Sequence, residues 1–324
     1  MACIMAAVLH RRKSLLIASA LLIVSLHAVA QSSVATAADY VPEWQTAAGG
    51  HQEFDVASIH ENKNQDGPSS INVPYGPDPA FIPTGGVFRT QNWPLWQLIV
   101  FGFKLTTAQR EQMIASLPDW AKNATYDIDA RSENVDLTKD QLRLMVQSLF
   151  AQRFQLKVHS EVREVPVYDV VVAKAGALGP GLRPHPAGDA CSPVAARNEQ
   201  SNYNGALTIE GGFPVRCGSL VRMQPSQPYL RKEGCRNLPM EQIVGTFTGM
   251  ANLGRPTVDK TGLAGTYDWV MEFFDESFGR RPPADAEGMP FDEALRKETG
   301  LKLVGSKAAL RFLVTDHIER PSEN

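Results

Sequence analysis

The chain has 324 residues, 43% of them hydrophobic, which suits one large folded domain or two smaller ones that share a core. Its formal net charge of -3 is mildly acidic, and its lysine and arginine residues form no cluster along the sequence beyond residue 30. This balance argues against nucleic acid and anionic lipid as partners. The sequence lacks the motifs of a serine nucleophile, a phosphate-binding loop and a zinc peptidase, so no motif specifies a reaction.

The first 30 residues follow the plan of an export signal. Three basic residues at 11–13 precede an apolar run over 15–26, and Ala-Val-Ala at 28–30 has the small-x-small pattern of a cleavage site. The run is shorter than the roughly 20 apolar residues of a membrane-spanning helix, so cleavage is favoured over a retained anchor. We expect a signal peptide over 1–30 and an exported mature protein, periplasmic or extracellular, without a membrane span.

The next segments are predicted from composition and alternation. Residues 31–52 are small and polar without periodicity, which indicates a flexible leader. Residues 53–59 alternate as a strand does, and residues 62–86 are rich in Pro, Gly and Asn, which indicates a long loop. One face of the strand is expected to carry its even-numbered side chains, namely Phe54, Val56 and Ser58.

Two helices are predicted after a short strand at residues 85–89. Asn92 is a suitable N-cap, with Pro94 tolerated in the first helical turn. The second helix has the clearer signal, because Thr138 and Gln141 form a capping-box pattern ahead of an apolar stripe.

Alternating strands follow the second helix. Residues 154–159 and 165–172 are expected to form a hairpin that turns at residues 161–164. Near the end of the chain the same succession returns in shortened form, with a helix at 291–299, Gly300 as its cap, and strands at 301–304 and 310–314.

The chain contains the same phrase twice. Asn-x-Pro-x-x-Gln followed by two apolar residues occurs at 92–99 and at 237–244, and Thr-Tyr-Asp follows at 125–127 and at 266–268. This recurrence predicts a duplicated unit of strand, helix, strand, helix, strand, strand. The fold class is therefore α+β, with two pseudo-symmetric repeats and a mixed, mostly antiparallel sheet.

The repeats are expected at residues 53–175 and 231–324. Between them, residues 176–230 form a connection rich in Gly and Pro that carries two cysteines. A connection of this length is functional or disordered.

Three cysteines lie beyond the signal: Cys191, Cys217 and Cys235. An oxidising compartment favours one disulfide among them and one buried or free thiol, and the pairing stays open. No Cys-x-x-Cys pattern and no histidines at ligand spacing accompany them, so neither a metal nor a cofactor is expected.

The densest motif spans residues 254–263 and contains Arg255, Asp259 and Lys260. Its Asp-Lys-Thr-Gly phrase is similar to the phosphorylated loop of P-type ion pumps, but those pumps need many membrane spans and a nucleotide domain. A tight turn into the following strand is favoured. The alternative is a ligand-facing cluster of these three residues.

Asp127 and Asp268 are the matching carboxylates of the two Thr-Tyr-Asp phrases, and Asp129 shares a strand face with Asp127. Two carboxylates across a groove could perform acid and base catalysis on a glycosidic bond. Strand carboxylates on a solvated face are the commoner case.

Four phrases in order, at residues 53–59, 137–159, 254–269 and 316–324, resemble a soil-associated family of exported bacterial proteins with domain of unknown function 3738. The resemblance implies a stand-alone secreted protein, and similar domains occur behind membrane zinc-peptidase sensors. It supplies no catalytic residues. The chain departs from the family where His60-Glu61 replaces a frequent Lys-Pro, and where Gly245 and Gly249 interrupt a helix.

We therefore expect a non-enzymatic protein that binds an unknown envelope or extracellular ligand or protein between its repeats, near the 176–230 loop and the 255–260 turn. One alternative is a secreted hydrolase of polysaccharide, with Asp127 and Asp268 as its acid/base pair at roughly 5–10 Å across one groove. Another is a sensory or inhibitory module for a membrane peptidase, which predicts a protein partner.

Overall fold

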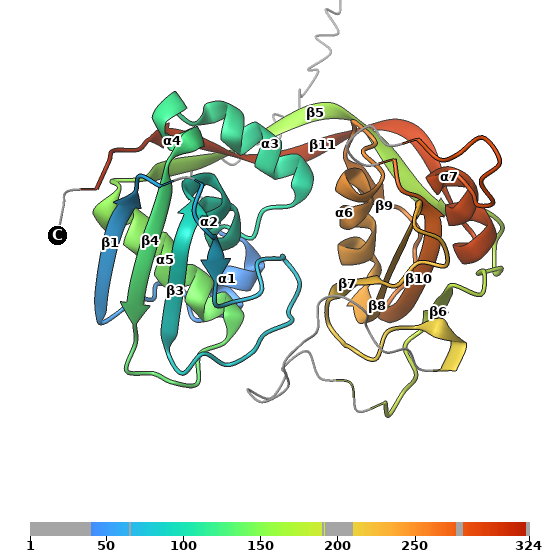
Figure 1. Cartoon of the computed structure of the whole chain (residues 1–324), viewed down its shortest axis with the longest axis horizontal. Helices are drawn as coiled ribbons and strands as arrows, with labels where there is room; N and C mark the ends of the chain where they lie inside the picture. The colour runs from blue at the N-terminus through green and yellow to red at the C-terminus, as the bar shows by residue number, and fades with distance from the viewer. Residues whose placement is uncertain (1–39, 65, 190, 192–209, 277–280, 322–324) are drawn as a thin grey trace, which may run out of the picture. The chain divides into compact units, whose positions relative to one another are not determined.

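The computed structural model describes residues 40–64, 66–189, 191, 210–276 and 281–321. The predicted signal peptide at 1–30 lies outside these residues, as do the first part of the predicted leader and part of the predicted connection. Helices combine with antiparallel sheets and one parallel strand pair, which confirms the α+β fold class (Figure 1). In the described part of the chain, none of the helices has the length and apolar character needed to cross a bilayer.

The first sheet has four antiparallel strands in the order β1-β4-β3-β2. They are β1 (Val56–Asn62), β4 (Thr125–Arg131), β3 (Val87–Pro94) and β2 (Ser70–Ile71). Alternate residues of β4, such as Tyr126 and Ile128, are buried in a core with the apolar side chains of the first helices. Those helices are α2 (Leu95–Gly102), α3 (Thr107–Ser116), α4 (Asp119–Asn123) and α5 (Lys139–Arg153).

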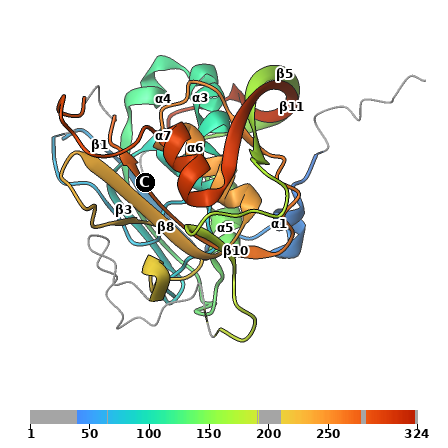
Figure 2. The same cartoon turned by 90° about the vertical axis from the view of Figure 1, so that its right-hand side faces the viewer.

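The second sheet also has four antiparallel strands, in the order β6-β10-β8-β7. They are β6 (Leu182–Pro184), β10 (Thr266–Phe274), β8 (Leu230–Pro239) and β7 (Leu220–Met223). Figure 2 shows β8 and β10 side by side. A second core forms between this sheet and the helices α6 (Met240–Met250) and α7 (Phe291–Ala294), the latter continuing as a π-helical turn (Leu295–Thr299).

Two long strands, β5 (Lys157–Val172) and β11 (Leu301–His317), form one antiparallel ladder along their whole length (Figure 1). At one end Val158 and Leu313 pack against the first core, and at the other Val170 and Leu301 belong to the second. A short parallel strand, β9 (Thr257–Asp259), pairs with β5. The ladder thus contributes to both cores.

The predicted hairpin at residues 154–172 is wrong, and so is the division of residues 301–314 into two strands. Residues 161–164 read Glu-Val-Arg-Glu and contain none of the Gly, Asn, Asp or Pro residues that tight turns require. Each segment instead continues as one strand, because the other supplies a hydrogen-bonding partner at nearly every position.

The predicted flexible leader contains a one-turn helix, α1 (Glu43–Ala47), in its described part. The Gln45 amide donates to Gln147 of α5 at 3.3 Å, so this segment packs on the first helices despite its polar composition. The strand that follows begins at Val56, which is 61% exposed. Its contact with the first core comes from Ile59, which is 2% exposed, and from Ala57 on the same face.

Asn92 and Asn237 do not cap helices, contrary to the prediction for Asn92. Both lie inside strands, β3 and β8, and the helices begin after Pro94 and Pro239. Each Asn has a positive φ, 47° and 56°, at an irregularity in its ladder. Asn tolerates this left-handed conformation better than most residues do, which explains its recurrence.

Other predictions are confirmed or extended. Thr138 caps α5, and its side chain and that of Gln141 form the reciprocal capping box. Gly300 ends the last helical segment in the left-handed conformation. The 176–230 segment is more than a connection, because it supplies the edge strands β6 and β7. α3 was not predicted, although Thr106 and Gln109 form a second capping box before it.

Candidate functional site

A cavity of about 870 Å³ is lined by residues of the helices α1, α2, α3, α5 and α6 and of the strands β5, β7, β8 and β11. Its volume lies within the range of small-molecule sites in proteins. Apolar and aromatic side chains form much of its wall, among them Tyr40, Trp44, Phe101, Phe103 and Leu313. The cavity is therefore large enough, and apolar enough, for an organic ligand.

Two glycines of α6 shape this cavity. A Cβ at Gly245 would have no atom within 4 Å, so this helix face opens onto empty space. A Cβ at Gly249 would lie 3.2 Å from the Thr107 side chain, so glycine permits the close approach of α3 and α6. Glycine inside a helix costs about 1 kcal/mol relative to alanine. In α6 this cost falls on the part of the helix that lines the open cavity.

The charges on the wall are unbalanced. Among the described residues that line the cavity, five are permanently basic and one is acidic, Glu241. The whole chain, by contrast, has a formal net charge of -3. The basic residues are Lys104, Arg110, Arg143, Arg231 and Arg311. A site with this excess attracts an anion.

Three of these cations are held by carboxylates outside the cavity wall. Lys104 lies 3.0 Å from Asp140, which also pairs with Arg143. Burial acts to raise the pKa of Asp140, but its two cationic neighbours outweigh burial and hold that pKa below its usual range. Arg231 is bound to Glu233 at 2.7 Å.

The other two cations are held less tightly. The nearest carboxylate to Arg110 is that of Glu111, at 4.0 Å and two-thirds exposed. The guanidinium of Arg311 lies 3.7 Å from the ring centre of Tyr40, and no described carboxylate pairs with it. These two side chains keep most of their capacity to bind an anion.

Three wall residues have a buried polar atom without a hydrogen-bonding partner among the described residues. They are Tyr75 (Oη), Arg143 (Nε) and Gln242 (Oε1). Burial raises the pKa of Tyr75 to about 12, although Arg110 acts in the opposite direction. Each unsatisfied polar group costs about 1–3 kcal/mol. A ligand that supplies donors and acceptors would remove part of that cost.

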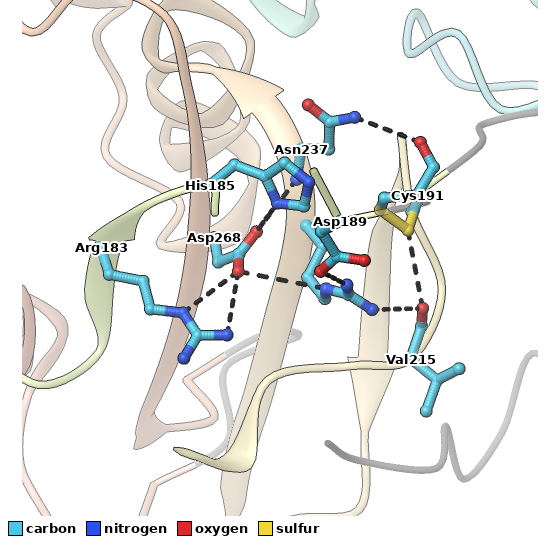
Figure 3. Close-up of a disulfide and its surroundings, with 9 residues drawn as sticks. Arg183, His185, Asp189, Cys191, Val215, Asn237 and Asp268 are labelled. Atoms are coloured by element: carbon cyan, nitrogen blue, oxygen red, sulfur yellow. Dashed lines mark hydrogen bonds and ion pairs between the residues drawn. A yellow bond between two sulfur atoms is a disulfide. The ribbon is translucent and has the colours of Figure 1, made fainter. Parts of the chain in front are cut away.

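The predicted residue Asp268 lies outside this wall, in a polar cluster of the second sheet (Figure 3). Its carboxylate is fully buried and lies 2.7 Å from Nδ1 of His185. It also accepts hydrogen bonds from Arg183 at 3.1 Å and from the backbone N–H of Asn237 at 3.2 Å. Its lone pairs are thus occupied by the protein itself.

Asp127 occupies the corresponding place in the first sheet. It accepts a hydrogen bond of 2.6 Å from the backbone N–H of Asn92 and one of 3.0 Å from the side chain of Asn62. Asp127 and Asp268 therefore each bind the backbone N–H of an Asn from an Asn-x-Pro phrase, in two different sheets. Neither lines the cavity, so the structure does not bring the two predicted carboxylates into that site.

Arg255, Asp259 and Lys260 also lie outside the cavity wall. Arg255 stands over the ring of Tyr168 at 5.5 Å. Asp259 accepts hydrogen bonds from the backbone and the hydroxyl of Thr261, which forms the tight turn that the motif predicts. The backbone N–H of Lys260 donates to Val170, so this motif extends the pairing of β9 with β5.

The cysteines fall into two classes. Cys191 and Cys217 form a disulfide beside the Asp268 cluster (Figure 3). Cys235 is a free, fully buried thiol, and burial raises its pKa above the ordinary value. Within the described residues, no three His, Cys, Asp or Glu side chains gather closely enough to hold a metal ion.

No sequence motif marks the basic residues of the cavity, because they come from separate elements, with Arg110 on α3 and Arg311 on β11. One local signal was available. Gly245 and Gly249 stand four residues apart in a helical pattern and therefore share one face, where their cost indicates a packing or functional reason.

The sequence profile of a family described as "Protein of unknown function (DUF3738)" matches residues 96–318. This match covers more than half of the chain and includes α2 to β11. No curated protein and no solved structure matches the chain significantly.

Proposed function

This chain belongs to the DUF3738 family of proteins of unknown function, and from that premise we propose that it is a non-enzymatic binding protein of the cell envelope or extracellular space. Its ligand site is the cavity of about 870 Å³ beside α6. The observation that carries the proposal is the composition of this wall, where apolar surface, unpaired polar atoms and an excess of basic residues occur together. Pre-formed small-molecule sites have this composition.

The position of the carboxylates favours binding over hydrolysis. A glycosidase requires two carboxyl groups across one groove. Asp127 and Asp268 belong to different sheets, and each is hydrogen-bonded to neighbouring residues. Asp268 is buried and Asp127 is half-buried, and the hydrogen bonds of both are typical of structural carboxylates.

Export is the second part of the proposal. It is supported by the signal pattern of residues 1–30 and by the Cys191–Cys217 disulfide, which is typical of oxidising compartments. Expression of the full chain in a bacterial host checks this point. We expect the product in the periplasm or medium, with a mass that corresponds to cleavage before Gln31. A full-length product in the cytoplasm would contradict export.

The binding site is tested by thermal-shift screening of the exported product against small organic molecules, wall fragments and glycans. A ligand at a hundredfold excess over its dissociation constant adds about 2.7 kcal/mol of stability. The blocking variant is Gly245→Phe, which introduces a ring at a cavity-lining position where an added Cβ would have no atom within 4 Å. Shifts that occur in the wild type and disappear in this variant support the proposal. No shift, or shifts that the variant retains, would contradict it.

A further inference from the structure

We infer that the ligand of this cavity is an organic anion with a flat apolar body, such as an aromatic carboxylate or sulfonate. This inference rests on the proposed function, because it names the class of ligand for the same site. It begins from the five basic residues and one acidic residue among the described members of the wall. Their excess opposes the acidic character of the whole chain, so it is a local feature of the cavity.

The anionic group would bind at Arg110 or Arg311. Lys104 and Arg143 are both paired with the carboxylate of Asp140, and Arg231 is paired with Glu233, so each has a carboxylate at hydrogen-bonding distance. Arg110 has only the distant, exposed Glu111, and Arg311 has the face of Tyr40. A guanidinium binds a planar carboxylate through paired N–H donors, which makes arginine well suited to this ligand class.

The inference that the ligand has an apolar body rests on the aromatic side chains in the rest of the wall. Aromatic side chains from four places in the chain line the cavity: Tyr40 and Trp44, Tyr75, Phe101 and Phe103, and Phe312. Aromatic rings favour stacked or edge-on contacts with another flat ring. A small inorganic anion would leave this surface and most of the volume unfilled.

Buried polar atoms support an anion with further acceptors. Arg143 is 1% exposed, and its Nε–H has no partner among the described residues. Tyr75, whose hydroxyl is also unpaired, is a neutral donor at physiological pH, because even the ordinary pKa of a tyrosine is about 10. A second oxygen on the ligand could accept a hydrogen bond from either group.

Two fluorescent probes that differ only by one sulfonate group provide the test. Anilinonaphthalene sulfonate carries an anionic group on a flat apolar body, and phenylnaphthylamine is its neutral counterpart. Both are titrated into the exported wild-type protein. We expect the sulfonate to bind at least about tenfold more tightly, because a hydrogen bond between charged groups contributes about 1.5–3 kcal/mol. Its affinity should also fall with added salt.

Variants locate the bound probe. Arg110→Gln and Arg311→Gln should each weaken sulfonate binding, by about tenfold for the residue that holds the anion, and change phenylnaphthylamine binding less than about twofold. Gly245→Phe should remove both. The matched control is Arg255→Gln, which changes an arginine outside the cavity wall and should leave both affinities unchanged.

The outcomes separate this inference from the proposed function. Equal affinities for the two probes would overturn the inference that the ligand is an anion, while the cavity would remain the binding site. Sulfonate binding that survives Gly245→Phe, or that depends on Arg255, would place the probe elsewhere and overturn the inference. Failure of both probes would also overturn it, whereas the proposed function would fail only if the ligand screen found no shift that Gly245→Phe removes.

Discussion

Nδ1 of His185 lies 2.7 Å from the carboxylate of Asp268, which has no exposed surface. The guanidinium groups of Arg183 and Arg236 lie 3.1 Å and 4.0 Å from the same carboxylate. The negative charge of Asp268 therefore stabilises several donor groups that are partly or fully removed from water. Removing one member of such a buried cluster leaves the others uncompensated.

We expect Asp268→Ala to lower the free energy of unfolding by about 3 kcal/mol or more. Asp127→Ala is the matched control, because Asp127 binds the corresponding backbone N–H but has neutral asparagine neighbours as its hydrogen-bonding partners. Its cost should be about 1–2 kcal/mol. Urea denaturation of both variants measures the difference, and equal costs would contradict the structural role assigned to the Asp268 cluster.

Replacing glycine by alanine should change the stability of the protein differently at the two glycines of α6. Gly245→Ala should stabilise the protein by about 0.5–1 kcal/mol, because alanine favours the helix and its methyl group meets no neighbour. Gly249→Ala brings a methyl group within 3.2 Å of Thr107, so contact strain should cancel or reverse the gain. Paired denaturation curves check this order. A larger gain at Gly249 would disprove the close approach of α3 and α6.

Lys139 predicts a dependence of stability on alkaline pH. Its pKa is lowered from 10.5 to about 8, mainly because the ammonium is buried, with Asp78 acting in the opposite direction. Below pH 8 the folded state carries a disfavoured charge. Between pH 8 and 10.5 the unfolded state binds more protons than the folded state, so the contribution of Lys139 to stability rises with pH.

The measurement compares wild type with Lys139→Met by urea denaturation at pH 7 and pH 10. The stability of the wild type relative to the variant should increase by about 2 kcal/mol over this range. Lys307→Met supplies the control, because the Lys307 side chain is 70% exposed. An unchanged difference for Lys139→Met would mean that its ammonium is solvated in the folded protein.

The disulfide predicts a dependence on reductant. Cys191 and Cys217 are 26 residues apart, and closing a loop of that length stabilises the folded state by about 3.5 kcal/mol in the chain-entropy account. Reduced wild type should lose about this amount of stability. The Cys191→Ser/Cys217→Ser double variant should match the reduced protein and not respond to reductant. Equal stability of oxidised and reduced wild type would show that the bridge constrains nothing.

Features that depend on contacts between residues close in the sequence were predicted correctly, whereas features that depend on distant contacts were not. The capping box of Thr138 and Gln141 was correctly identified, because its hydrogen bonds join residues three positions apart. The role of Asn92 was not, because its N–H pairs with Asp127, 35 positions away. The duplication itself stays a prediction, and the equivalent bond between Asn237 and Asp268 supports it.

The candidate site shows the same contrast more strongly. The motif around Asp259 was correctly interpreted as a turn, because Thr261 completes it locally. The cavity residues were not identified, since Arg110 and Arg311 lie about two hundred positions apart and neither has a motif around it. Only the glycines of α6 carried a local indication that something unusual stands beside that helix.

The sequence by itself determined the α+β class, the family, the helix start at Thr138 and the turn at Asp259, because these features depend on side chains and backbone within a few residues. Only the tertiary structure decided that β5 and β11 are single strands, that Asp268 is buried in a charged cluster, and that basic residues of distant elements share one cavity. Those features depend on which surfaces pack together. That choice minimises the free energy of the whole chain, and no local pattern encodes it.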